Sequence, residues 1–123
     1  MALHNQLPIY KQGYDLLSLA ADVQANMPRT FKASLGNKIH SECIEILVLI
    51  GRANAARGIG RAPHIMALVE RIEVVTLLLR LSHDKRFVSP KLWAGAVLLT
   101  ESIGKQAGGW LKSARNMNMV PAA

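Results

Sequence analysis

The sequence predicts an all-α protein folded as an up-down-up-down antiparallel four-helix bundle. Half of the residues are apolar (50%), which excludes disorder over most of the chain, and aromatic residues make up 5%, so the core must be largely aliphatic. Proline and glycine divide the chain into four segments joined by short connections. Apolar residues in these segments recur at spacings of three and four, and no segment alternates with the period of two that a strand requires.

The first two segments end at clear stop signals. A helix is expected over residues 8–25, because Pro28 pushes the residue before it out of the helical region. A second helix is expected over residues 32–57, and Gly58-Ile59-Gly60 stops it. The spacing predicts that the buried faces are Ile9, Gly13, Leu16, Ala20 and Val23 in the first helix and Leu35, Ile39, Cys43, Ile46, Ile50 and Ala53 in the second.

The last two segments begin at clear start signals. The third helix is expected from a first-turn proline at Pro63 to about Asp84, and the fourth from the serine cap of Ser89-Pro90 to about Arg115. Their predicted buried faces are Ile65, Leu68, Ile72, Val75 and Leu79, then Leu92, Ala96, Leu99, Ile103 and Trp110. We expect one domain over residues 1–123, with an ordered core over 8–115 and a frayed tail over 116–123.

A second apolar stripe on the third helix predicts contact with another subunit. At 100° per residue this stripe lies roughly opposite the core face, and it consists of Ala67, Val74, Leu78 and Leu81 with Arg71 in the gap. The fourth helix has an apolar flank of Trp93, Val97, Gly104 and Leu111. We therefore expect an oligomer interface made by Ala67, Arg71, Val74, Leu78, Leu81 and Trp93. The alternative is an irregular bundle in which the third helix is central.

Three glycines in the second half of the fourth helix, at positions 104, 108 and 109, would allow close backbone approach. Glycine inside a helix costs about 0.5–1 kcal/mol relative to alanine, so tight packing is expected to offset that cost. The alternative is a local kink at Gly108-Gly109.

The sequence lacks the patterns of an enzyme or of a metal or cofactor site. His40 and Cys43 are one helical turn apart, but no second cysteine exists to complete a zinc site. No strand precedes Gly58-Ile59-Gly60, so a dinucleotide fingerprint is not indicated. The single cysteine fits a reducing compartment, and no signal peptide or membrane span is evident, so we expect a cytoplasmic protein without catalytic residues, cofactor or metal.

An excess of basic residues is the strongest functional signal. Lys and Arg number 15 against 8 Asp and Glu, which gives a net charge of +7 and predicts attraction to a polyanion. An antiparallel bundle would gather these residues at its two ends, with Lys11, Arg52, Arg57, Arg61, Lys105, Lys112 and Arg115 at one end and Arg29, Lys32, Lys38, Arg80, Lys85, Arg86 and Lys91 at the other. Cations commonly lie at helix C-termini, but Arg29, Lys32 and Lys91 lie near N-termini, where cations are disfavoured.

The basic residues expected to bind nucleic acid or a protein partner are Arg52, Arg57, Arg61, Arg80, Lys85, Arg86, Lys91, Lys105, Lys112 and Arg115. Aromatic residues are not expected to interleave with these basic clusters, so stacking on unpaired bases is not indicated. Contact with the nucleic-acid backbone, with little sequence specificity, is the mode that this pattern favours.

Several short stretches resemble the accessory variability determinant (Avd) family of diversity-generating retroelements. The most specific is Gly108-Gly109-Trp110-Leu111-Lys112-Ser113, and the others are Leu77-Leu78-Leu79-Arg80-Leu81-Ser82-His83-Asp84, Ser89-Pro90-Lys91, Ile103-Gly104-Lys105 and Met27-Pro28-Arg29. The resemblance implies a basic, non-catalytic four-helix bundle assembled as a homopentameric barrel. It also implies binding to the element's reverse transcriptase and to RNA or DNA in support of mutagenic retrohoming.

A related bundle family is encoded by intervening sequences within bacterial large-subunit ribosomal RNA genes. If the chain belongs to that family instead, it is expected to be a protein-interaction adaptor whose basic residues bind an acidic protein. The Ser-Pro-Lys and Gly-Gly-Trp stretches favour the retroelement family.

Overall fold

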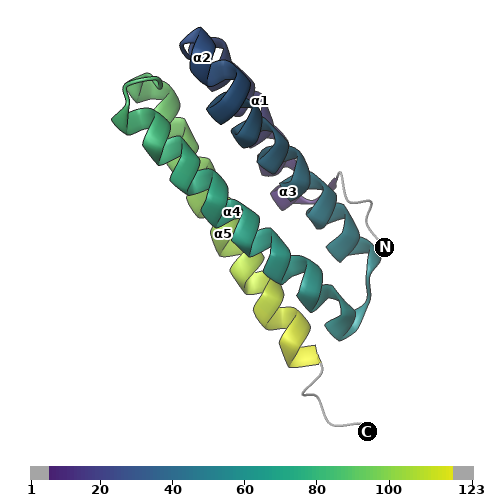
Figure 1. Cartoon of the computed structure of the whole chain (residues 1–123). Coiled ribbons are helices and arrows are strands. Elements are labelled where there is room, and N and C mark those ends of the chain that lie inside the picture. The colour runs from purple at the N-terminus through teal and green to yellow at the C-terminus, as the bar shows by residue number, and fades with distance from the viewer. Residues whose placement is uncertain (1–5, 118–123) are drawn as a thin grey trace, which may run out of the picture.

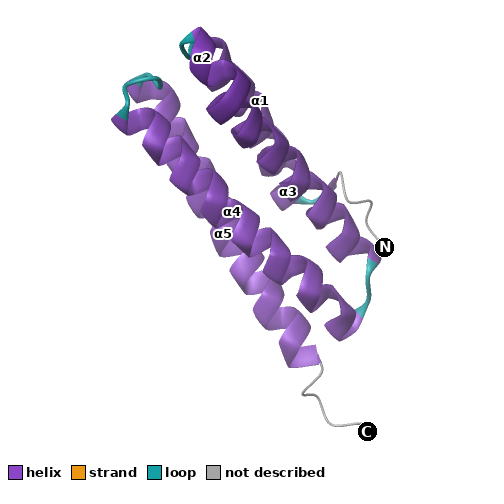
Figure 2. Ribbon diagram, in the orientation of Figure 1, coloured by secondary structure: helices purple, strands orange, loops and turns teal. Residues whose placement is uncertain are grey.

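The computed structural model describes residues 6–117, and within this part of the chain every regular element is a helix (Figure 2). Four long helices are present: α1 (Pro8–Ala25), α3 (Asn37–Ala55), α4 (Ala62–Asp84) and α5 (Pro90–Met117). A single-turn helix, α2 (Arg29–Phe31), continues into α3 through a π-helical turn over Lys32–Gly36, and a 3₁₀ turn over Gly58–Arg61 precedes α4. The predicted all-α architecture of four long helices is confirmed.

The long helices form an antiparallel bundle (Figure 1). α1 and α4 each pack against both α3 and α5, so α1 and α4 lie on opposite corners. Each helix runs antiparallel to its two neighbours, as short connections require. The bundle therefore has two ends, the α3–α4 end, where α1 begins and α5 finishes, and the α4–α5 end, where the chain also turns from α1 into α2.

The core contains the apolar stripes that helical periodicity predicts. All five residues predicted for α1 and all five predicted for α4 are buried. In α3 the stripe is buried from Ile39 to Ala53, and Leu35, one turn earlier, is only partly buried. In α5 the buried residues are Ala96, Thr100, Ile103, Ala107 and Ala114, whereas the predicted Leu92, Leu99 and Trp110 lie at the edge of the core.

Three helix boundaries differ from the prediction by two residues or more. The second helix ends at Ala55 instead of residue 57. The second helical segment begins at Arg29 instead of residue 32, because the carbonyl oxygen of Pro28 accepts hydrogen bonds from the N–H groups of Phe31 and Lys32. The fourth helix continues through Met117, so residues 116 and 117 are helical, while the rest of the predicted frayed tail lies outside the described residues.

The π-helical turn is held by a side chain from α1. Nε2 of Gln24 donates hydrogen bonds to the carbonyl oxygen of Lys32 at 2.9 Å and to Oδ1 of Asn37 at 2.8 Å. Gly36 is buried beneath this side chain, and a Cβ atom there would lie 2.6 Å from Cγ of Gln24. The absence of a side chain at position 36 therefore allows α1 and the π-helical turn to approach closely.

An ion-pair network joins α3 to α4. Nη1 of Arg71 lies 3.2 Å from Oε1 and 3.0 Å from Oε2 of Glu42, and Nζ of Lys38 lies 2.9 Å from Oε1. The Glu42 side chain is 6% exposed. Burial raises the pKa of the Glu42 carboxyl and is the largest single influence, but Lys38 and Arg71 together outweigh it, so the pKa is lowered. This carboxylate therefore stabilises the folded state when it is ionised.

Gly36→Ala is expected to lower the free energy of unfolding by about 1–3 kcal/mol, because Gln24 can move away from the new methyl group only by losing its two hydrogen bonds. Urea unfolding followed by circular dichroism measures the change. Gly60→Ala is the control, since a Cβ atom there meets no other atom within 4 Å. Equal stability of the two variants would show that the approach at Gly36 is not tight.

Glu42→Gln is expected to destabilise the protein by about 1–3 kcal/mol at neutral pH, because Arg71 loses its charged partner. A lowered pKa in the folded state means that the stabilisation is complete above the ordinary value of 4.5 and is lost as the pH falls through the folded value. The difference between wild type and variant should therefore shrink on acidification.

Urea unfolding at neutral and acidic pH checks this pH dependence. Glu70→Gln serves as the control, because Glu70 is exposed and forms no ion pair with any residue between 6 and 117. A difference for Glu42→Gln that stays constant with pH would contradict the role given to the carboxylate.

Candidate nucleic-acid and partner interface

The structure places most of the predicted basic residues at the two ends of the bundle. Arg52, Arg57 and Arg61 surround the connection between α3 and α4, and Lys112 and Arg115 join them from the last turns of α5. Arg80, Lys85, Arg86 and Lys91 lie at or near the α4–α5 end. Lys105 is the exception, because it lies near the middle of α5 and not at the bundle end where it was expected.

Most of the predicted basic residues are exposed to solvent. All of them except Arg61 are exposed, and none forms an ion pair with a carboxylate anywhere in residues 6–117. The cations that do pair there are Lys38 and Arg71, both bound to Glu42. Nδ1 of His83 also lies 3.7 Å from Oδ1 of Asp84. The surface cations therefore keep their charge available to solvent at both ends.

Arg61 has a structural role that the sequence pattern does not reveal. Its Nε donates to the carbonyl oxygen of Ala56 at 2.9 Å, and its Nη2 donates to that of Asn54 at 3.5 Å. These carbonyls lie at the C-terminus of α3, where backbone acceptors have no partner within the helix. Arg61 therefore caps α3 while it adds its charge to the α3–α4 end.

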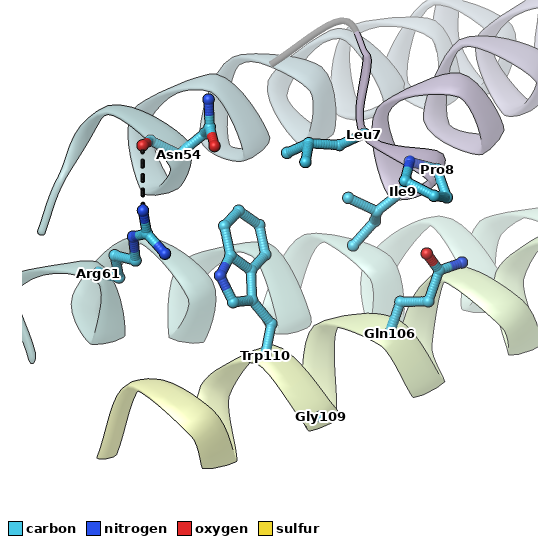
Figure 3. A pocket seen from close by; sticks show the side chains of 8 residues that line it. All are labelled: Leu7, Pro8, Ile9, Asn54, Arg61, Gln106, Gly109 and Trp110. Atoms are coloured by element: carbon cyan, nitrogen blue, oxygen red, sulfur yellow. Dashed lines mark hydrogen bonds between the residues drawn. The ribbon is translucent and has the colours of Figure 1, made fainter. Parts of the chain in front are cut away.

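A pocket opens beside Arg61 at the same end (Figure 3). The Trp110 indole projects from α5 into the space between the end of α3 and the start of α1. The pocket has a volume of about 370 Å³ and is lined by Leu7, Pro8, Ile9, Asn54, Arg61, Gln106, Gly109 and Trp110. Its walls are mostly apolar, with the guanidinium of Arg61 at one side.

Aromatic rings gather with the cations at the α4–α5 end. The rings of His83 and Trp93 are stacked, with centroids 4.5 Å apart and an interplanar angle of 13°. The rings of Phe31 and Phe87 pack with centroids 4.8 Å apart, and Nζ of Lys85 lies 5.9 Å from the Phe31 centroid. The interpretation that aromatic residues do not interleave with the basic clusters is wrong at this end. Phe87 follows Lys85 and Arg86 in the turn, Trp93 lies two residues after Lys91, and the fold adds Phe31 from α2.

The predicted oligomer stripe on α4 lies on a flank of the helix and not opposite its core face. Ala67 and Leu78 are partly buried against the core of the same subunit, Val74 is partly buried, and Arg71 pairs with Glu42 of α3. Leu81 is 41% exposed. The centre of this stripe lies roughly a third of a turn around α4 from the centre of the core stripe. The stripe therefore faces α3.

The exposed apolar residues include two that sequence reasoning missed. Leu77 on α4 is 66% exposed and Leu98 on α5 is 69% exposed. Leu77 and Leu81 are four residues apart, so they lie on the same outward face of α4. This spacing could have predicted an exposed apolar face from the sequence. Trp93, which was predicted at the oligomer interface, is partly buried and stacks on His83.

Three glycines in the second half of α5 have no neighbour that would exclude a side chain, unlike Gly95, where a Cβ atom would lie 3.3 Å from Cδ1 of Leu19. A Cβ atom at Gly104, Gly108 or Gly109 would meet no atom of the chain's other segments within 4 Å. The helix assignment continues through all three positions without interruption. Gly104 and Gly108, four residues apart on one flank of α5, therefore leave space beside the helix, whereas Gly109 lines the pocket next to Trp110.

Cys43 does not offer a reactive group at the surface. It is fully buried in the core, where burial raises the pKa of its thiol to about 12. Among the described residues, no three His, Cys, Asp or Glu side chains are grouped to hold a metal ion. None of the helices within residues 6–117 combines the length and apolar character needed to cross a bilayer.

Comparison with known proteins gives one match. A family model described as bAvd-like matches residues 7–114, which includes all four long helices almost completely. Curated proteins and solved structures give no significant match to the chain.

Proposed function

Because the chain belongs to the bAvd-like family, the accessory proteins of diversity-generating retroelements, we propose that it binds the element's reverse transcriptase and nucleic acid to support mutagenic retrohoming. In this role it is a cytoplasmic scaffold, and catalysis belongs to the polymerase. The observation that carries the proposal is the set of exposed, unpaired cations at both ends of the bundle.

The charge distribution supports binding to template RNA or cDNA. Lysine and arginine side chains that contact phosphates release condensed counterions, and this release favours binding at moderate salt. Arg52 and Arg57 are well placed for such contacts, because both are exposed and neither guanidinium forms a hydrogen bond with another residue between 6 and 117. Backbone contact of this kind gives little sequence specificity.

The apolar surface supports assembly into a homo-oligomer, which we propose to be a pentamer. Large apolar side chains exposed by more than a third occur on each of the long helices, namely Tyr14, Ile44, Val48, Met66, Leu77, Leu81 and Leu98. The open glycines of α5 would let a neighbouring helix approach its backbone closely. We propose that the contact uses the edge of the α4 stripe at Leu81, together with the exposed Leu77.

Replacing Arg52 and Arg57 together by glutamine is expected to weaken binding to single-stranded RNA and to reduce the slope of log affinity against log salt by about 1.4. Fluorescence anisotropy at several salt concentrations measures both quantities. The control is Ser18→Glu with Ala21→Glu, which changes the net charge equally on an exposed face of α1. Arg61 is left intact, because its loss would also uncap α3.

Each outcome of this titration bears on the proposal. Equal losses in the two double variants would mean that net charge matters and that the α3–α4 end is not a binding site. A wild-type protein with no salt-sensitive affinity would overturn the nucleic-acid part of the proposal and favour an adaptor that binds an acidic protein.

Leu81→Glu is expected to split the oligomer and leave the subunit helical, because it places a charge in an apolar interface but not in the core. Light scattering measures the molar mass, and circular dichroism measures helix content. Tyr14→Glu is the control, since Tyr14 is 59% exposed on α1, the helix across the bundle from α4. An unchanged mass for Leu81→Glu would place the interface elsewhere, and a monomeric wild type would reject assembly.

A further inference from the structure

A stacked ring pair joins the last turn of α4 to the first turns of α5. The near-parallel rings of His83 and Trp93 have centroids 4.5 Å apart, and the His83 side chain remains 40% exposed. A ring pair of this kind at a surface offers a flat platform on which a further aromatic system can stack.

A pocket lies directly beside this platform. It has a volume of about 590 Å³ and is lined by Asn26, His83, Arg86, Phe87, Val88, Ser89 and Pro90. This size is within the range of pockets that hold small organic ligands. The side-chain amide of Asn26 donates to the carbonyl oxygen of Asp22 at 2.9 Å, which leaves its oxygen as an acceptor at the pocket wall.

Arg86 occupies a backbone position that glycine would suit better. Its φ angle is +64°, in the left-handed region that residues with side chains rarely adopt. The turn fixes this conformation, because the Arg86 N–H donates to the carbonyl oxygen of His83 and the Phe87 N–H donates to that of Ser82, both at 2.9 Å. The sequence thus places a guanidinium at the pocket despite an unfavourable backbone angle.

The surroundings of the pocket are positively charged. Lys85, Arg86 and Lys91 are exposed and form no ion pair with any residue between 6 and 117. Asp84, beside His83, contributes one opposing charge. Flat rings combined with unpaired cations are the combination that proteins use to bind single strands, where rings stack on bases and cations contact phosphates.

We infer that the α4–α5 end binds an unpaired base of a single-stranded nucleic acid, with the base against the His83–Trp93 ring pair and its flanking phosphates on Lys85, Arg86 and Lys91. This inference rests on the proposed nucleic-acid role and adds a site and a structural preference to it. A duplex keeps its bases stacked on one another, so it can use the cations but not the rings. The end is therefore selective for unpaired strands, whereas Arg52 and Arg57 at the other end contact phosphates of either form.

The test compares affinities of the full-length protein for an unstructured RNA strand, a DNA strand of the same sequence and the duplex that each forms with its complement. His83→Ala is expected to weaken binding to the single strands by roughly 5- to 100-fold and to change duplex binding by less than about twofold. His83→Phe should restore the preference, because it keeps a flat ring. Comparison of the affinities for the RNA strand and the DNA strand shows which of the two nucleic acids the site binds more tightly.

A second measurement places the base at the ring pair. The chain has two tryptophans, so Trp110→Phe leaves Trp93 as the single reporter. Addition of the single strand should quench Trp93 fluorescence, and a strand without bases should not. Thermal unfolding of each variant shows whether the fold is intact.

The outcomes separate this inference from the proposed function. Equal wild-type affinity for single strand and duplex, or an equal loss of both in His83→Ala, would overturn the base site and leave phosphate binding in place. Unchanged Trp93 fluorescence on binding would also overturn it. A wild-type protein that binds neither form would overturn the nucleic-acid role itself.

Discussion

The bundle depends on a core of aliphatic side chains that excludes every aromatic ring. The buried apolar residues are Ile, Leu, Val, Ala, Met and Cys, and the large ones fit between four helices packed at close distance. The two phenylalanines, two tyrosines and two tryptophans of the chain all lie at the edge of this core or on the surface. The rings therefore remain available at the ends and along the sides of the bundle.

The same constraint explains how much of the fold could be predicted. Periodic apolar spacing fixes which side of each helix is buried, so the stripes of α1 and α4 were predicted completely. The π-helical turn could not be predicted, because it depends on Gln24, a residue of another helix, reaching the carbonyl oxygen of Lys32. Local propensity contains no information about such a contact.

The candidate site could be predicted from the sequence only in part. Charge and an antiparallel topology were enough to expect cations at both ends, and the exposed Arg52 and Lys85 lie there. The rings at the α4–α5 end come from positions as distant as Phe31 and Phe87, so their contact depends on packing alone. The capping role of Arg61 likewise depends on the path of the α3–α4 connection. An oligomeric contact cannot be located by spacing alone, since a flank such as that of Ala67 and Leu78 can pack against the subunit's own core.

The glycines of α5 that have no close neighbour affect the stability of the isolated subunit. Each glycine in a helix interior raises the cost of ordering the backbone by about 0.5–1 kcal/mol, and at Gly104 and Gly108 no atom of another segment lies within 4 Å of the point where a side chain would begin. If neighbouring copies cover this side, folding and assembly are linked by mass action. Scarce copies would then unfold more often and be degraded sooner than abundant ones, so the amount of protein synthesised would itself determine how long each molecule survives.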